Sequence, residues 1–160
     1  MIRVLFVCLG NICRSPIAEA TFRDLVEKRG LSHRIACDSA GTSNYHIGDL
    51  PDRRTRRNAE SHGLILTHRC RQLVRADFEE FDYIMAMDYA NFDTIQAKFS
   101  RDISNGQVFL LGKFDPEVTD GSVPAVPDPY YEDDSAFEDV YQMVRRCNEA
   151  FLDWIGSQRL

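Results

Sequence analysis

Short apolar runs alternate along the chain with longer segments in which apolar and polar residues mix. Val4–Cys8 is the clearest run, with five apolar residues in a row, which is typical of a strand that is buried on both faces. Weaker patterns of the same kind predict strands within residues 33–43, at Tyr83–Met87 and within residues 105–112.

Amphipathic segments separate these strands and predict helices. Residues 52–64 and 90–99 follow this pattern, and residues 135–155 carry apolar side chains at helical spacing. The segment from Lys113 to Tyr131 holds four of the six prolines and is predicted to be an irregular loop. Alternating strands and helices indicate an α/β fold, in which one parallel sheet forms the middle of three layers and carries helices on both faces.

The first helix is predicted to follow Val4–Cys8 after a short loop. Ser15 is a good N-cap, Pro16 suits the first helical position, and Glu19 lies where an acidic side chain favours the positive end of the helix. Gly30 is a plausible end point.

Length and composition indicate a single domain covering residues 1–160, with 44% hydrophobic and 28% charged residues. The net charge of −6 argues against general nucleic-acid binding, which requires a basic surface. No segment approaches the ~20 apolar residues of a membrane-spanning helix. The five cysteines are odd in number and irregularly spaced, without a signal peptide, which favours reduced thiols in the cytoplasm.

Unusual polar segments follow the predicted strands at Cys8–Ser15, Ser39–Tyr45 and Asp88, where ligands bind in parallel sheets. The first of them, CLGNICRS, combines the features of a phosphate cradle. Gly10 lets the backbone approach a ligand, Asn11 tolerates a left-handed conformation, and amides at a helix N-terminus attract anions. The phosphate is predicted to contact the whole loop: Leu9, Gly10, Asn11, Ile12, Cys13, Arg14 and Ser15.

Cys8 and Arg14 are the predicted reacting pair of this cradle. The planar guanidinium of Arg14 can bind two phosphate oxygens at once, and a positive pocket favours the thiolate form of Cys8 as nucleophile. By residue type alone a cysteine at a strand end is more often a small packing residue, but its neighbours favour a phosphate site. The lysine of a nucleotide-binding loop is missing, and Cys8 and Cys13 lack the second close pair of a zinc site.

Asp128 is the candidate proton donor, because expelling a phenolate benefits from an acid. It lies between Pro127 and Pro129, where an aspartate can instead be a simple turn residue. Aromatic side chains at Tyr130, Tyr131 and Tyr45 could form a slot around a substrate ring, or pack as ordinary loop residues.

Several segments together resemble the low-molecular-weight protein tyrosine phosphatases, over nearly the whole chain. They are VCLGNICRSPIAEA, DSAGTS, THRCRQL, MDYANF and DPYYEDDSAFEDVY. The resemblance implies a four-stranded parallel sheet, no metal or other cofactor, and hydrolysis of phosphotyrosine in a protein substrate through a cysteinyl-phosphate.

The resemblance also implies the roles of the matching residues. Cys8 is the nucleophile, Arg14 binds phosphate, and Asp128 acts as acid and then as base. Asn11, Ser15, Ser39 and His68 support the loop, and Cys13 can form a reversible disulfide with Cys8. The substrate pocket comprises Leu9, Ile12, Tyr45, Tyr130 and Tyr131. Members that prefer phosphoarginine tend to carry threonine at the position of Ile12, so isoleucine indicates phosphotyrosine.

Two other functions stay open at this point. An arsenate reductase could use the same cradle, but such enzymes need a further cysteine pair near mid-chain, and the segment DYIMAMDYANFD contains no cysteine. A catalytically silent phosphotyrosine-binding module could dispense with the nucleophile or the acid, whereas this chain carries candidates for both.

Overall fold

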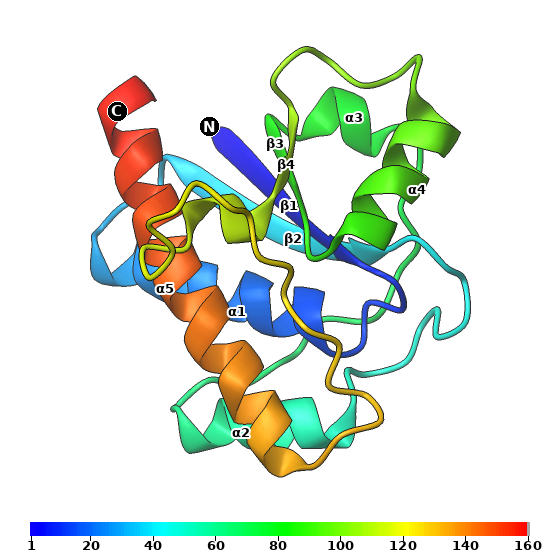
Figure 1. Cartoon of the computed structure of the whole chain (residues 1–160), viewed down its shortest axis with the longest axis vertical. Helices are drawn as coiled ribbons and strands as arrows, with labels where there is room; N and C mark the ends of the chain where they lie inside the picture. The colour runs from blue at the N-terminus through cyan, green and yellow to red at the C-terminus, as the bar shows by residue number, and fades with distance from the viewer. Residues whose placement is uncertain (160) are drawn as a thin grey trace.

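A four-stranded parallel sheet, in the order β2-β1-β3-β4, forms the centre of the computed structural model, which describes residues 1–159 (Figure 1). The strands are β1 (Ile2–Cys8), β2 (Ile35–Gly41), β3 (Tyr83–Ala86) and β4 (Val108–Leu110). The predicted fold class is confirmed, including the number of strands and their parallel direction.

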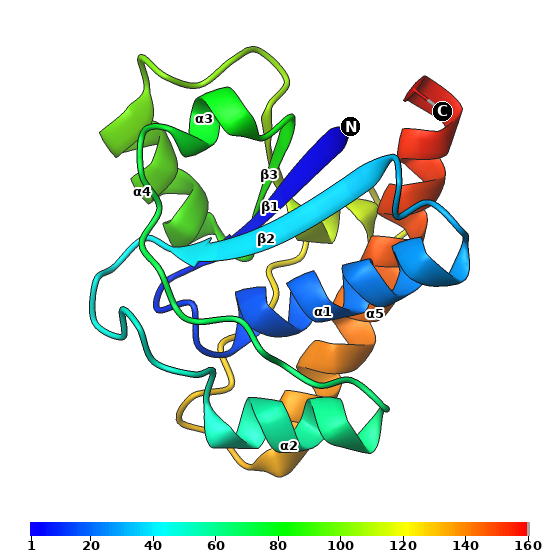
Figure 2. The same cartoon turned by 180° about the vertical axis from the view of Figure 1, so that it is seen from behind.

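Helices cover both faces of this sheet. On one face lie α1 (Arg14–Lys28) and α5 (Asp134–Arg159), and α2 (Arg53–Ser61) packs on α5. On the other face lie α3 (Asp77–Glu80) and α4 (Tyr89–Phe99), as the two opposite views show (Figures 1 and 2). A short 3-10 helix, η1 (Leu111–Phe114), follows β4 and contacts α5. Within residues 1–159, every helix is too short or too polar to cross a bilayer.

The central position of β1, with a core on each face, explains why apolar and polar residues do not alternate along it. Val4, Phe6 and Cys8 point toward α1 and α5, whereas Leu5 and Val7 point toward the core under α3 and α4. All five residues are 3% exposed or less, so every position of the strand is apolar. The chain therefore buries two cores, one on each face of a single sheet.

The connections after β1 and β3 leave the sheet on opposite faces. β1 leads into α1 and β3 leads into α4, and these two strands are neighbours in the sheet. A crevice forms outside the carboxyl ends of strands at such a switch point. The loop Cys8–Arg14 and Asp88 both begin at this crevice.

Three details of the sequence interpretation were wrong. The residue that precedes α1 is Cys13, whose side chain makes no capping hydrogen bond, so Ser15 lies inside the helix and is not its N-cap. Glu19 is outside the first turn and is buried at 3% exposure against Ser39 and His68. Strand β2 also continues to Gly41, so Ser39 lies within the strand and not after it. In each case the polar side chain makes a tertiary contact, and local helix and strand preferences carry no information about such contacts.

Candidate active site

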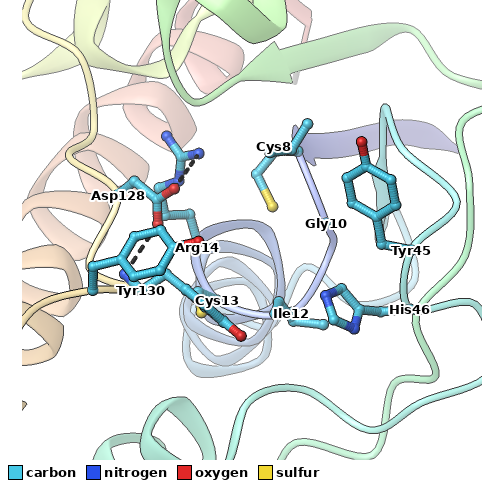
Figure 3. A pocket seen from close by; sticks show the side chains of 11 residues that line it. Cys8, Gly10, Ile12, Cys13, Arg14, Tyr45, His46, Asp128 and Tyr130 are labelled. Carbon is cyan, nitrogen blue, oxygen red and sulfur yellow. Dashed lines mark hydrogen bonds and ion pairs between the residues drawn. The ribbon is translucent and has the colours of Figure 1, made fainter.

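A pocket of about 220 Å³ opens over the loop that follows β1. Cys8 lies in it between Arg14, Asp128 and Tyr130 on one side and Tyr45 and His46 on the other (Figure 3). All predicted substrate-pocket residues line this pocket: Leu9, Ile12, Tyr45, Tyr130 and Tyr131. Segments far apart in the sequence therefore meet around one sulfur atom.

The Cys8 sulfur is held by the start of α1. Its Sγ lies 3.0 Å from the Ser15 Oγ, which accepts a hydrogen bond of 2.8 Å from the Asn11 side chain. Because the Asn11 amide donates to the hydroxyl oxygen, the hydroxyl hydrogen can go to the sulfur or to the Ala40 carbonyl oxygen, which lies 3.4 Å away. The hydroxyl can therefore hold the sulfur in place by a hydrogen bond.

Asn11 fixes the turn of the loop. It has φ +57°, the one left-handed non-glycine residue in the described part of the chain. Its Nδ2 donates to Ser15 and Ser39, and its Oδ1 accepts from His68 Nε2 at 2.7 Å and from the Arg71 amide at 3.0 Å. Asn11 and Ser15 are fully buried. The predicted supporting residues are thus brought together, with the Asn11 and Ser15 side chains behind the loop and outside the pocket lining.

Arg14 is anchored on one side and open to the pocket on the other. Its Nη1 donates to Asp88 Oδ2 at 2.6 Å and to the Val126 carbonyl oxygen at 3.1 Å. Burial opposes the charge on this guanidinium, but Cys8 and Asp88 outweigh burial and raise its pKa above the ordinary value. Its second nitrogen, Nη2, lies 3.8 Å from Asp128 Oδ2.

Asp128 makes the contact of a turn residue, and its carboxyl group also lines the pocket. Its Oδ1 accepts a hydrogen bond of 3.1 Å from the Tyr130 amide, which is the turn contact, while Oδ2 faces Arg14. The side chain is 48% exposed, so the carboxyl group can exchange protons with solvent. Tyr130 packs edge to face on Tyr131, and Arg54 donates to the Tyr130 carbonyl at 2.9 Å.

Cys13 is the second cysteine that lines the pocket. Burial, reinforced by the Asp52 carboxylate, raises the pKa of the Cys13 thiol to about 12. This cysteine is therefore protonated at neutral pH.

A partly buried cluster of titratable side chains, Glu19, Asp38 and His68, supports the loop from behind. His68 Nδ1 lies 3.4 Å from Glu19 Oε1 and 3.3 Å from Asp38 Oδ1, and Ser39 Oγ donates to the same Glu19 oxygen at 2.7 Å. Burial alone raises the pKa of Asp38, but hydrogen bonds from His68 and the Ser39 amide and the charge of Arg71 hold it below its usual value. The nearest ligand atoms of Glu19, Asp38 and His68 lie within 4.8 Å of one another, a spacing that could suit a cation. In the described residues these atoms contact each other and Ser39, so the cluster already has internal partners.

Sequence reasoning gave no role to several residues that shape the site. Asp88 was noted only for its place after a strand, yet it anchors Arg14. Gly41 ends β2 against the loop, where an added Cβ would lie 2.7 Å from the Leu9 carbonyl oxygen. His46 lines the pocket beside Gly10, and Arg71 contacts Asn11. Their contacts join residues 30 or more positions apart, and the sequence carries no local signal for them.

The chain matches known proteins over nearly its full length. The family model described as low molecular weight phosphotyrosine protein phosphatase matches residues 3–159. The human protein of that name is 46% identical over 151 residues, covering 94% of this chain and 93% of its own length, and the rat protein is 47% identical over 152 residues with the same coverage.

Solved structures agree with this match. The structure titled YfkJ from Bacillus subtilis has a TM-score of 0.90 at 39% identity, covering 100% of this chain and 98% of its own. A Drosophila arginine phosphatase has a TM-score of 0.86 at 34% identity, covering 98% and 99%. The chain belongs to the low molecular weight phosphotyrosine protein phosphatase family.

Proposed function

We propose that this protein hydrolyses phosphotyrosine in protein substrates through a cysteinyl-phosphate, without a metal ion. One observation carries the proposal: the Cys8 sulfur faces a pocket in which Arg14 Nη2 and Asp128 Oδ2 are 3.8 Å apart. A phosphoryl group above the sulfur would meet a cation that binds its oxygens and a carboxyl group that can protonate its leaving oxygen. Family membership supports the same chemistry.

In the first step, the Cys8 thiolate attacks phosphorus and the bond to the tyrosine oxygen breaks. The amides of the loop and the guanidinium of Arg14 hold the equatorial oxygens, where charge accumulates. Asp88 and Val126 keep the guanidinium in place, so little reorganisation is needed. Asp128 gives its proton to the phenolate, whose conjugate acid has a pKa of about 10.

In the second step, Asp128 takes a proton from water, which attacks the cysteinyl-phosphate and releases inorganic phosphate. The exposed position of Asp128 at the pocket mouth suits this role, because water can reach it. The Ser15 hydroxyl, which lies 3.0 Å from the sulfur, then donates a hydrogen bond to the departing thiolate and keeps its proton.

A trapping experiment tests the mechanism. Rapid quenching of the enzyme with radiolabelled aryl phosphate should leave label on Cys8, identified by peptide mapping. Cys8→Ser should carry no thiophosphate label, and Cys13→Ser is the matched control that removes the neighbouring thiol and should still be labelled. Label on a histidine, or steady turnover by Cys8→Ser at the wild-type rate, would disprove the cysteinyl-phosphate.

We propose phosphotyrosine over phosphoarginine because Ile12 lines the pocket where threonine is typical of phosphoarginine-specific members. Exposed Tyr45, Tyr130 and Tyr131 offer aromatic faces to a phenyl ring. Peptides that differ only in phosphotyrosine or phosphoarginine should show a kcat/KM ratio well above 10 in favour of tyrosine. Equal or reversed ratios would contradict this assignment.

We also propose that Cys13 protects Cys8 from irreversible oxidation in a reducing cytoplasm. Peroxide converts the Cys8 thiolate to a sulfenic acid, and attack by Cys13 then forms the disulfide and releases water. Because the pKa of Cys13 is raised to about 12, few molecules carry its thiolate at pH 7, and disulfide formation should accelerate as pH rises. Cys13→Ser should recover less activity with dithiothreitol after peroxide. Equal recovery would remove Cys13 from this role.

A further inference from the structure

We propose that Arg71 is a positioning residue for the loop Cys8–Arg14, here called the phosphate loop. Its guanidinium holds residues 68–73, here called the strap, in a position from which the strap fixes Asn11. The inference deepens the proposed function and rests on it. It concerns a residue outside the pocket lining, which acts on the oxyanion through the loop.

The strap holds Asn11 from three positions. His68 Nε2 lies 2.7 Å from Asn11 Oδ1, and the Arg71 amide donates to the same oxygen at 3.0 Å. The Cys70 thiol donates to the Asn11 main-chain carbonyl at 2.8 Å. Both oxygens of Asn11 are therefore held by the strap, at the residue that has the left-handed conformation.

The strap also holds the end of β2 against the loop. The Gly41 amide donates to the Arg71 carbonyl at 2.9 Å, and the Leu73 amide donates to the Gly41 carbonyl at 2.7 Å. Gly41 in turn lies so close to Leu9 that a Cβ would be 2.7 Å from its carbonyl oxygen. A shift of the strap would therefore move the loop through two separate contacts.

The strap is irregular backbone, with one isolated β-bridge between Gln72 and Gly41. Main-chain hydrogen bonds tie it to Gly41, Gly48 and Asp49, and the Arg71 side chain adds contacts beyond these. Arg71 Nε donates to Asp38 Oδ2 of β2 at 3.0 Å, and its two terminal nitrogens donate to the two oxygens of Asp77 of α3 at 3.1 and 3.0 Å. One planar guanidinium thus joins the strap to a strand and to a helix.

Arg71 also balances the charges around His68. Asp38 contacts both the Arg71 Nε and the His68 Nδ1, so the carboxylate that Arg71 orients is the one that orients the imidazole. Without the guanidinium, buried Asp77 would lose its bidentate partner and Asp38 would be free to turn away from His68. His68 would then hold Asn11 less firmly.

A matched pair of variants tests the inference. Arg71→Met removes a guanidinium that is 31% exposed and pairs with an aspartate that is 4% exposed, and Arg146→Met removes one that is 30% exposed and pairs with Asp115 at 3%. Both should lower the melting temperature. Only Arg71→Met should weaken the binding of inorganic phosphate, measured by calorimetry, and kcat/KM for p-nitrophenyl phosphate, each by about 10 to 100-fold.

Arg71→Lys keeps the charge but loses the fork, so it should fall between wild type and Arg71→Met, and it serves if Arg71→Met does not fold. Arg146→Met should bind phosphate within about twofold of wild type. Phosphate binding by Arg71→Met or Arg71→Lys that matches Arg146→Met would overturn the inference. A wild-type protein that binds phosphate but hydrolyses no aryl phosphate would instead overturn the proposed function, because the binding comparison needs no turnover.

Discussion

At the scale of single residues, backbone conformation and close contact fix the identities at two positions of the site. Asn11 has φ +57°, and its amide supplies hydrogen bonds that help to hold that conformation. Gly41 has no unusual φ but has no room for a Cβ. The first requirement is visible in the sequence, because asparagine after glycine indicates a turn, whereas the second depends on a loop more than 30 residues away.

Gly41→Ala should damage the loop from behind. The added methyl group would press on the Leu9 carbonyl oxygen, so we expect a loss of about 1 to 3 kcal/mol in unfolding free energy and weaker phosphate binding. Gly156→Ala is the control, since nothing lies within 4 Å of its Cβ in α5, and it should stabilise by about 0.5 to 1 kcal/mol. Denaturant unfolding and phosphate calorimetry measure both. Wild-type phosphate binding by Gly41→Ala would show that the contact is easily relieved.

Asp128→Asn should slow phosphotyrosine hydrolysis by roughly 10² to 10⁴ fold, because asparagine keeps the turn contact with the Tyr130 amide but cannot give a proton. The loss should be smaller for p-nitrophenyl phosphate, whose leaving group is less basic than tyrosine. Asp120→Asn, in an exposed turn with Ser122, is the control. An equal loss for both substrates would indicate that Asp128 contributes charge or position and not a proton.

At the scale of elements, the sequence predicted what depends on local pattern and missed what depends on tertiary contact. The strand Val4–Cys8 was clear because it is a continuous apolar run, and the final helix was clear because its buried residues recur at helical spacing. The start of α1 was misplaced because Ser15 turns its hydroxyl toward Cys8 and not toward the helix amides. The loop after Lys113 was correctly predicted to be largely irregular, but its anchor at buried Val126, which binds Met87 and Arg14, has no local signature.

The ion pair between Asp115, which follows η1, and Arg146 of α5 should make the free energy of unfolding depend on pH. Burial alone raises the pKa of Asp115, but Arg146 and the Glu117 amide outweigh it and hold the pKa below the ordinary value of about 3.9. A lowered pKa in the folded state stabilises the protein at every pH above the ordinary pKa. This contribution to the free energy of unfolding is lost as the pH falls through the folded-state pKa.

Asp115→Asn should therefore be about 1.5 to 3 kcal/mol less stable than wild type at pH 7, and the difference should shrink below pH 4. Urea unfolding of both proteins between pH 7 and pH 2.5 measures it. A difference that stays constant over this range would mean that the carboxylate charge contributes nothing and that only shape matters.

At the scale of the whole molecule, the site and the largest aromatic cluster lie toward opposite ends of the sheet. The phosphate loop follows the carboxyl end of β1, whereas the only tryptophan, Trp154, packs on Tyr83 at the start of β3 and on Phe109, Phe114 and Phe151. Both ends share β1 and β3, whose residues belong to the two cores. A sheet with a core on each face is expected to unfold as one unit.

Bound phosphate should consequently raise the unfolding free energy of the region around Trp154, although the phosphate lies at the other end of the sheet. Urea unfolding followed by Trp154 fluorescence and by far-UV circular dichroism should give one midpoint, and phosphate at about 100 times its dissociation constant should add about 2.7 kcal/mol to the unfolding free energy by both probes. Cys8→Ser, which keeps the cradle, should respond similarly. A phosphate-dependent shift in circular dichroism without one in fluorescence would mean that residues 1–160 contain two units that unfold separately, because only the unit with the cradle would gain stability from the ligand.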